Sequence, residues 1–115
     1  ADAFAELGGR LLLVDRDGEA LEALAATLAA AHGAEAEPHR CDLEDERART
    51  ALVDAIVTRG LPLHVLVNNA AFVGTSALAG WAEPFERQST DTWRRAIEVN
   101  LTAAFDLCRG LVPVL

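Results

Sequence analysis

Acidic and amide side chains stand where short apolar segments of this 115-residue chain end. Asp15 and Asp42 each end one such segment, and the pair Asn68 and Asn69 follows another. Carboxylates and amides can hydrogen-bond to the hydroxyl groups of a ligand. In an open parallel sheet the strands end at a common crevice that binds ligands, so we expect these residues to converge there. The alternative for the two asparagines is an ordinary turn, since Asn is a common turn residue.

The elements that would position these residues alternate between strand and helix. Apolar runs of strand length and segments with helical periodicity follow one another, with Gly and Pro between them. This alternation predicts an α/β fold in which crossover helices join parallel strands. The predicted strands are residues 10–15, 39–41 and 64–67, and the predicted helices are residues 1–7, 17–33, 44–59 and 89–113, with a long loop at residues 72–88.

Capping residues give the predicted ends of the two middle helices. Asp17 is a suitable N-cap for the first of them, and Gly33 ends it. Asp42 can cap the next, although it could also contact a ligand, and one residue can do both. That helix would turn inward the residues Ala48, Leu52, Ala55 and Ile56.

The last predicted helix carries an amide on its apolar face. Ser89 is its candidate N-cap. Its predicted apolar stripe consists of Trp93, Ile97, Ala104, Leu107 and Leu111. Asn100 falls on this stripe, and a buried amide without partners costs about 1–3 kcal/mol. We therefore expect Asn100 to be hydrogen-bonded, either as a structural residue or in a catalytic network.

Composition excludes several classes of function. The chain has 10 basic and 18 acidic residues, so its net charge of −8 disfavours nucleic acid and anionic membranes as partners. Cys41 and Cys108 have no disulfide-like or metal-like spacing, and we expect both to be buried and no metal to bind. We expect a cytoplasmic protein because no apolar run approaches the roughly 20 residues of a spanning helix.

Asp15 is suited to recognise a nucleotide. A carboxylate at the end of an apolar strand can accept both ribose hydroxyls of an adenosine, and its charge would repel a 2′-phosphate. This favours NAD over NADP. Two alternatives stay open: Asp15 is a turn or capping residue, or the neighbouring Arg16 accepts a 2′-phosphate.

Four segments together resemble a known family. They are Leu12-Leu13-Val14-Asp15-Arg16, Cys41-Asp42-Leu43, Leu66-Val67-Asn68-Asn69-Ala70 and Val99-Asn100-Leu101-Thr102. In this order and at this spacing they resemble the short-chain dehydrogenase/reductase family. The resemblance implies a partial Rossmann-like three-layer fold, with a three-stranded parallel sheet flanked by helices, that binds a nicotinamide dinucleotide.

The resemblance also implies roles for single residues. Asp15 would hold the adenosine ribose, with Arg16 beside it, and Asn100 would be the catalytic Asn that fixes a water in a proton relay. The other residues that it implies at the cofactor are Asp42 and Leu43 at the adenine, and Asn68, Asn69, Ala70 and Ala71 along the cofactor's course.

Other parts of the family pattern are absent from the chain. Ala71 stands where the family usually has Gly, and the chain contains no Tyr. By resemblance, the glycine-rich loop belongs before Ala1, and the catalytic Ser and the Tyr-x-x-x-Lys pair belong after Leu115. We therefore expect residues 1–115 to be a single, incomplete NAD(P)-binding domain that transfers no hydride alone.

The leading hypothesis is the cofactor-binding portion of an NAD-dependent oxidoreductase that interconverts a secondary alcohol and a ketone. Its partners would be the dinucleotide and a small-molecule substrate, and family resemblance implies a homodimeric or homotetrameric parent. The alternative is a sensor or regulator that binds a dinucleotide on the same fold without turnover.

Overall fold

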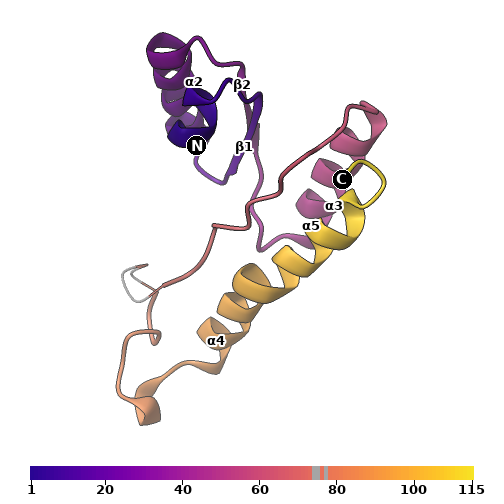
Figure 1. The fold of residues 1–115 in the computed structure, drawn as a ribbon. Helices are drawn as coiled ribbons and strands as arrows, with labels where there is room; N and C mark the ends of the chain where they lie inside the picture. The colour runs from indigo at the N-terminus through magenta and orange to yellow at the C-terminus, as the bar shows by residue number, and fades with distance from the viewer. Residues whose placement is uncertain (74–75, 77) are drawn as a thin grey trace. The chain divides into compact units, whose positions relative to one another are not determined.

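A computed structural model describes residues 1–73, 76 and 78–115. Residues 74, 75 and 77, which fall in the predicted loop at 72–88, lie outside the described residues. The chain divides into two compact units, Ala1–Asp42 and Leu43–Leu115. The first unit carries a sheet, and the second is helical (Figure 1).

The first unit is a strand–helix–strand unit preceded by a short helix. Its elements are α1 (Asp2–Glu6), β1 (Leu11–Asp15), α2 (Gly18–His32) and β2 (Ala36–Arg40). The two strands pair in parallel, with Leu11 opposite Ala36 and Asp15 opposite Arg40. Because α2 joins them, the prediction of parallel strands connected by a crossover helix is confirmed.

The helix α2 begins and ends at the capping residues that the sequence predicts. The Asp17 side chain accepts a hydrogen bond from the Ala20 N–H at 3.0 Å, and Gly33 adopts a left-handed φ of 65°. The apolar face of α2 then packs on β1 and α1. The buried residues of this small core are Ala5, Leu13, Leu21 and Leu28.

The second strand begins earlier than predicted. It spans Ala36–Arg40 and contains Pro38, whereas the sequence indicated only residues 39–41. Proline lacks a backbone N–H and is confined to strand edges or bulges. β2 accommodates it because β1 is its only strand neighbour in the described part of the chain.

The third predicted strand is not formed. The described residues contain a two-stranded sheet, and residues 64–71 have irregular backbone outside it. An apolar run becomes a strand only when a neighbour supplies its hydrogen bonds. Val65 and Val67, which the pattern placed in a buried strand, are exposed. The parallel α/β class is confirmed with two strands in place of three.

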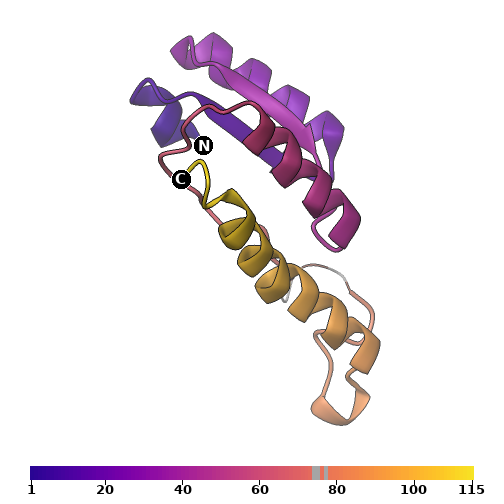
Figure 2. The same cartoon turned by 90° about the vertical axis from the view of Figure 1, so that its right-hand side faces the viewer.

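The second unit is built on a long helical rod against which one further helix packs. Its helices are α3 (Glu46–Thr58), the short 3₁₀ turn η1 (Phe85–Arg87), α4 (Thr90–Ile97), the π-helical turn η2 (Glu98–Thr102) and α5 (Ala103–Leu111). The elements α4, η2 and α5 form the continuous rod, and α3 lies beside α5 (Figure 2). A Cβ at Gly110 would stand 2.7 Å from Val53 Cγ1, so the two helices approach closely.

The helix α3 does not begin as predicted. Asp45, not Asp42, is its N-cap, with Oδ1 accepting from the backbone N–H groups of Arg47 at 2.8 Å and Ala48 at 3.4 Å. The inward face also differs, because Ala55 is exposed and the buried residues are Arg49, Leu52 and Ile56.

The buried stripe of the rod is shifted by one residue in its first half. Trp93 and Ile97 are exposed, and the buried residues are Thr92, Ala96, Val99, Ala103, Leu107 and Leu111. The π-turn explains the shift: the Ala103 N–H donates to the Glu98 C=O five residues back, so the turn holds one extra residue. A stripe extended backward from α5 at straight α-helical spacing therefore lies one position off in α4.

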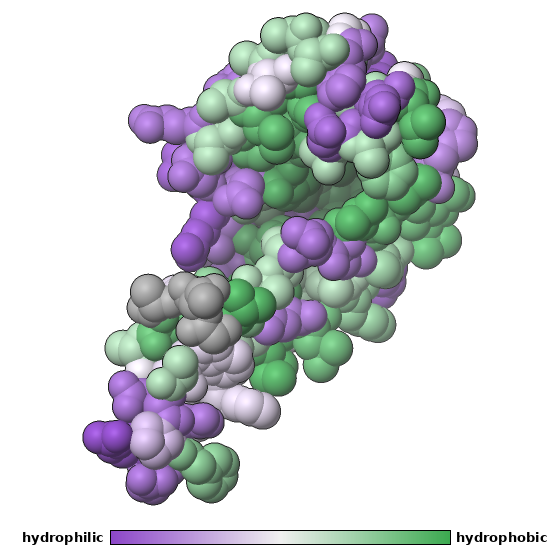
Figure 3. Space-filling view, turned by 60° about the vertical axis from the view of Figure 1, so that its left-hand side comes forward, coloured by the Kyte–Doolittle hydropathy of each residue, from purple (hydrophilic) through white to green (hydrophobic). Residues whose placement is uncertain are grey.

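Several large apolar side chains are exposed, part of them visible as green surface in Figure 3. Cys41 is buried as expected, but Cys108 is exposed, and the two cysteines form no disulfide in the described part of the chain. None of the helices in the described segments is long and apolar enough to cross a membrane. Those segments also contain no group of three or more His, Cys, Asp or Glu that could hold a metal ion.

Candidate functional site

In the first unit, the carboxyl ends of both strands carry charged side chains. Asp15 ends β1, and the register places it opposite Arg40 at the end of β2. The Asp15 carboxylate accepts the Asp17 N–H at 3.0 Å, and its backbone C=O accepts the Cys41 N–H at 2.9 Å. The exposed carboxylate is thus fixed at the sheet edge, where such folds bind nucleotides.

Arg40 is a component of this site that the sequence reasoning missed. Its Nε donates to the Arg16 C=O at 3.2 Å, and a Cβ at Gly18 would stand 3.4 Å from its Cδ. The Arg40 side chain therefore lies across the turn between β1 and α2. The available signal was its place in the predicted strand at residues 39–41, one position before Cys41. Two arginines, Arg16 and Arg40, stand near the Asp15 carboxylate.

Asp42 and Leu43 follow β2. Asp42 is exposed, and the expectation that it caps α3 is wrong because Asp45 performs this function. The Leu43 C=O, in the second unit, accepts a hydrogen bond from Arg49 Nη1 at 2.6 Å. Within the second unit, this hydrogen bond anchors the Leu43 backbone to α3.

The segment with the paired asparagines is anchored to the rod at one point. Asn68 Nδ2 lies 3.4 Å from the Cys108 Sγ of α5 as a hydrogen-bond donor. Asn69, Ala70 and Ala71 are exposed, so their side chains and backbone are accessible to a ligand.

Asn100 holds the residue that follows this segment. Its Oδ1 accepts the Phe72 N–H at 2.7 Å, and its Nδ2 donates to the Phe72 C=O at 2.9 Å. The Phe72 side chain is buried with Ala96 and Val99. The expectation that Asn100 is hydrogen-bonded is confirmed, but it does not lie on the buried stripe. It is exposed, and its amide can still accept and donate one further hydrogen bond each.

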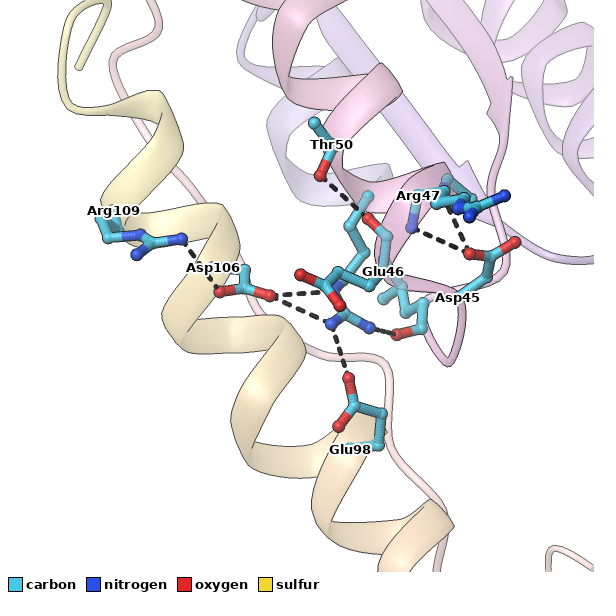
Figure 4. Close-up of polar contacts among 10 residues, drawn as sticks. Asp45, Glu46, Arg47, Thr50, Glu98, Asp106 and Arg109 are labelled. Carbon is cyan, nitrogen blue, oxygen red and sulfur yellow. Dashed lines mark hydrogen bonds and ion pairs between the residues drawn. The ribbon is translucent and has the colours of Figure 1, made fainter.

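Arg49 of α3 is the centre of a polar network that joins α3 to the rod. Its guanidinium donates from Nε and Nη2 to Asp106 Oδ2, at 3.1 and 3.0 Å, and from Nη2 to Glu98 Oε1 at 2.5 Å. Figure 4 shows Glu98 and Asp106 projecting from the same side of the rod toward α3. Burial alone would lower the pKa of Arg49, but the hydrogen bonds and charges of the two carboxylates outweigh it and raise the pKa.

Arg95, which lies in α4, contacts both Glu44 and Phe72. Arg95 Nε and Nη2 donate to the Glu44 carboxylate at 2.6 and 3.0 Å. The same guanidinium lies 5.7 Å from the centroid of the Phe72 ring, within the range of a cation–π contact. Phe72 is thus held through its backbone by Asn100 and through its ring by Arg95. Sequence reasoning missed Arg49 and Arg95, because an Arg in a helix usually faces solvent.

The structure therefore groups the predicted residues by unit. It places Asp15, Arg16 and Asp42 at the ends of the strands of the first unit. It places Asn68, Asn69, Ala70, Ala71 and Asn100 in the second unit, where the Phe72 backbone connects the asparagine segment to the π-turn.

Comparison with known proteins decides the family. The family model for short chain dehydrogenase matches residues 1–115, which is the whole chain. The chain belongs to the short-chain dehydrogenase family. Its D-threitol dehydrogenase relative from Mycolicibacterium smegmatis is 34% identical over 114 residues, which cover 96% of this chain and 40% of that protein.

Solved oxidoreductase structures share the fold. A metagenomic short-chain oxidoreductase in complex with NADP is 33% identical, with a TM-score of 0.84 over 99% of this chain and 48% of its own. An NAD⁺-bound xylitol dehydrogenase is 29% identical, with a TM-score of 0.79 over 95% of this chain and 39% of its own. The chain thus spans less than half the length of these relatives.

Proposed function

We propose that this chain is the cofactor-binding portion of an NAD-dependent oxidoreductase that interconverts a secondary alcohol and a ketone. The observation that supports it is the fixed, exposed Asp15 carboxylate at the carboxyl end of a parallel strand, in a chain of the short-chain dehydrogenase family. Both compact units would belong to a single NAD(P)-binding domain at residues 1–115.

In this proposal the first unit recognises the adenosine half of the cofactor. The Asp15 carboxylate accepts the ribose hydroxyls, with Arg16 beside it, and Asp42 contacts the adenine together with Leu43 of the second unit. The residues fit this half of the dinucleotide because Asp15 is held at the sheet edge by the Asp17 N–H. When bound, the nicotinamide would supply the hydride chemistry, and the residues of this chain supply binding and orientation.

The choice between NAD and NADP depends on the balance of charge around Asp15. Its carboxylate repels a 2′-phosphate, whereas Arg16 and Arg40 attract one. Several of the similar solved structures hold NADP or NADPH, while xylitol dehydrogenase holds NAD⁺. We favour NAD because a carboxylate at the strand end lies where the ribose hydroxyls bind.

The second unit carries the residues next to the nicotinamide half. Asn68, Asn69, Ala70 and Ala71 line the course of the cofactor. Asn100 is the catalytic asparagine, and its amide retains one lone pair and one N–H with which it can orient a water molecule. Asn100 would also hold the segment before Phe72 next to the π-turn through its two hydrogen bonds to the Phe72 backbone.

The test is turnover by the full-length protein. Purified protein is mixed with NAD⁺ and a panel of secondary alcohols that includes D-threitol, the substrate of the relative from Mycolicibacterium smegmatis. We expect NADH formation, and we expect Asn100→Ala to reduce kcat. The 115-residue chain alone should form no NADH, because it has no Tyr to act as the general acid of the family.

The second candidate is a dinucleotide-binding sensor on the same fold without turnover. NADH binding by the full-length protein without turnover of any alcohol in the panel would support it. In both cases we propose a cytoplasmic homodimer or homotetramer. The rod has exposed apolar side chains that support association with another surface, namely Trp93, Ile97, Leu101 and Phe105.

A further inference from the structure

The π-turn aligns two carboxylates that a straight helix would separate. Glu98 and Asp106 are eight positions apart. In a straight α-helix such residues point about 80° away from each other, whereas residues seven positions apart differ by about 20°. Because the π-turn inserts one residue, the directions of Glu98 and Asp106 differ only as much as those of residues seven positions apart in a straight helix. Both side chains therefore project toward α3 (Figure 4).

Arg49 occupies the position between these two carboxylates. Its side chain is only 2% exposed, while those of Glu98 and Asp106 are 35% and 22% exposed. The guanidinium uses Nη2 for both carboxylates, Nε for Asp106 and Nη1 for the Leu43 C=O. One rigid cation therefore spans the π-turn from its first residue to the helix that follows it.

The same turn presents Asn100 to Phe72. Asn100 is the third residue of Glu98–Thr102, and both of its hydrogen bonds go to the Phe72 backbone. If the turn relaxed to regular α-helix, the direction of Asn100 would rotate by about 100° relative to one of the flanking helices. The two hydrogen bonds to Phe72 would then be lost.

We propose that Arg49 is a positioning residue for Asn100, because its bridge to Glu98 and Asp106 maintains the π-turn. Arg49 itself would not touch cofactor or substrate. Its effect would reach the reaction through the orientation of Asn100 and through the segment that Asn100 holds at Phe72. A catalytic consequence rests on the proposed function, whereas the structural coupling does not.

The structural coupling is tested by hydrogen exchange on the full-length protein. NMR follows the exchange of the Phe72 amide, which donates to Asn100, and of the Leu107 amide in α5 as a reference for the unfolding of the unit. Arg49→Met removes the charge while keeping an unbranched side chain. We expect the ratio of the Phe72 rate to the Leu107 rate to rise about 10-fold, the effect of losing a charge-assisted hydrogen-bond network.

The matched control removes packing from the same helix pair. Val53→Ala weakens the contact of α3 with Gly110 but leaves Arg49 and its partners in place. If Arg49 only attached α3 to the rod, both variants would change the ratio equally, and the proposal would fail. If only Arg49→Met raises it, the coupling is supported. Should Arg49→Met not fold, Arg49→Lys replaces it; this variant keeps the positive charge but loses the planar set of N–H donors of the guanidinium. We expect Arg49→Lys to raise the ratio by a smaller factor. An unchanged ratio would overturn the proposal.

The catalytic consequence has separate readouts. For Arg49→Met we expect kcat to fall by a larger factor than the Kd for NADH rises, because Asp15 is untouched and Leu43 alone among the proposed adenosine contacts loses its hydrogen bond to Arg49. An unchanged kcat together with an altered exchange ratio would overturn the positioning role. A wild-type protein that binds NADH but turns over no alcohol would contradict the proposed enzyme, and the exchange ratio would still decide the coupling.

Discussion

Gly110 of α5 is in close contact with Val53 of α3. This contact predicts that Gly110→Ala lowers the free energy of unfolding in the wild-type protein but raises it in a Val53→Ala variant. A Cβ at Gly110 would meet Val53 Cγ1 at 2.7 Å, Cγ2 at 3.1 Å and Cβ at 3.4 Å. Rotation of the valine side chain cannot relieve the contact, because both methyl groups and the branching carbon are close. Gly110→Ala should therefore force the two helices apart.

The magnitude follows from two opposing effects. Alanine is favoured over glycine within a helix by about 0.5–1 kcal/mol, while overpacking a tight contact costs about 1–3 kcal/mol. We expect Gly110→Ala to lower the free energy of unfolding by about 1 kcal/mol. In a Val53→Ala background the clash is removed, and the same substitution should raise this free energy by about 0.5–1 kcal/mol.

Urea unfolding of the four proteins of this double-mutant cycle, made in the full-length protein, measures the coupling. We expect a coupling energy of about 1.5–2 kcal/mol, which exceeds the roughly 0.3–0.5 kcal/mol scatter of independent sites. Additive effects would refute the close packing of α3 on α5. They would also remove the basis for placing Arg49 against Glu98 and Asp106.

Two further predictions concern α3. Asp45→Ala should lower the free energy of unfolding by about 1 kcal/mol, because the N-cap hydrogen bonds are lost. Asp45→Asn keeps the cap and should change this free energy by about a few tenths of a kcal/mol. Equal losses for the two variants in urea unfolding would argue against the cap. Arg49→Met should cost about 2–3 kcal/mol, because its two carboxylates lose a buried partner. The exposed Arg94→Met, which breaks a surface pair with Asp91, should cost less than about 0.5 kcal/mol, and a similar loss from both arginines would contradict the buried network.

The pKa of Arg49 also predicts how the stabilisation by the Arg49 network depends on pH. Because the pKa is raised in the folded protein, the stabilisation is fully present below the ordinary pKa of arginine and is lost only as pH rises through the higher folded value. Deprotonation of Arg49 should therefore not weaken the network anywhere in the neutral and moderately alkaline range. The difference in unfolding free energy between wild type and Arg49→Met should stay constant from neutral to moderately alkaline pH. A difference that shrinks there would contradict this assignment.

The first strand and the helix that follows it were predictable because their signals are local. An apolar run that ends in Asp15, a capping Asp17 and a left-handed Gly33 each act within a few residues, and the structure uses all three as predicted. The sequence also identified Asn100 as a residue that needs hydrogen-bond partners. It could not show that both partners belong to Phe72, which lies 28 positions earlier.

The errors have physical causes that a periodic pattern does not contain. Asp42 and Asp45 are both acceptable caps for the same helix, and the structure uses the second. The apolar stripe shifted because a π-turn inserts one residue, which a fixed 3.6-residue period cannot represent. Arg49 was missed because its burial depends on carboxylates 49 and 57 positions away.

The third strand illustrates a different limit. Apolar residues at 64–67 indicated burial, but a strand also requires a hydrogen-bonded neighbour, and none pairs with this segment in the described chain. Periodicity reports which side chains favour burial; it does not report which backbone groups find partners.

The most direct test of the central claim is calorimetric titration of the full-length protein with NADH and with NADPH. The account predicts that NADH binds more tightly than NADPH and that Asp15→Ser weakens NADH binding about 10-fold, the loss of a charged hydrogen bond to the ribose. It also predicts that the same substitution improves NADPH binding, because the repulsion of the 2′-phosphate is removed. Tighter binding of NADPH by the wild type, or NADH binding that is unaffected by Asp15→Ser, would contradict the assignment of Asp15.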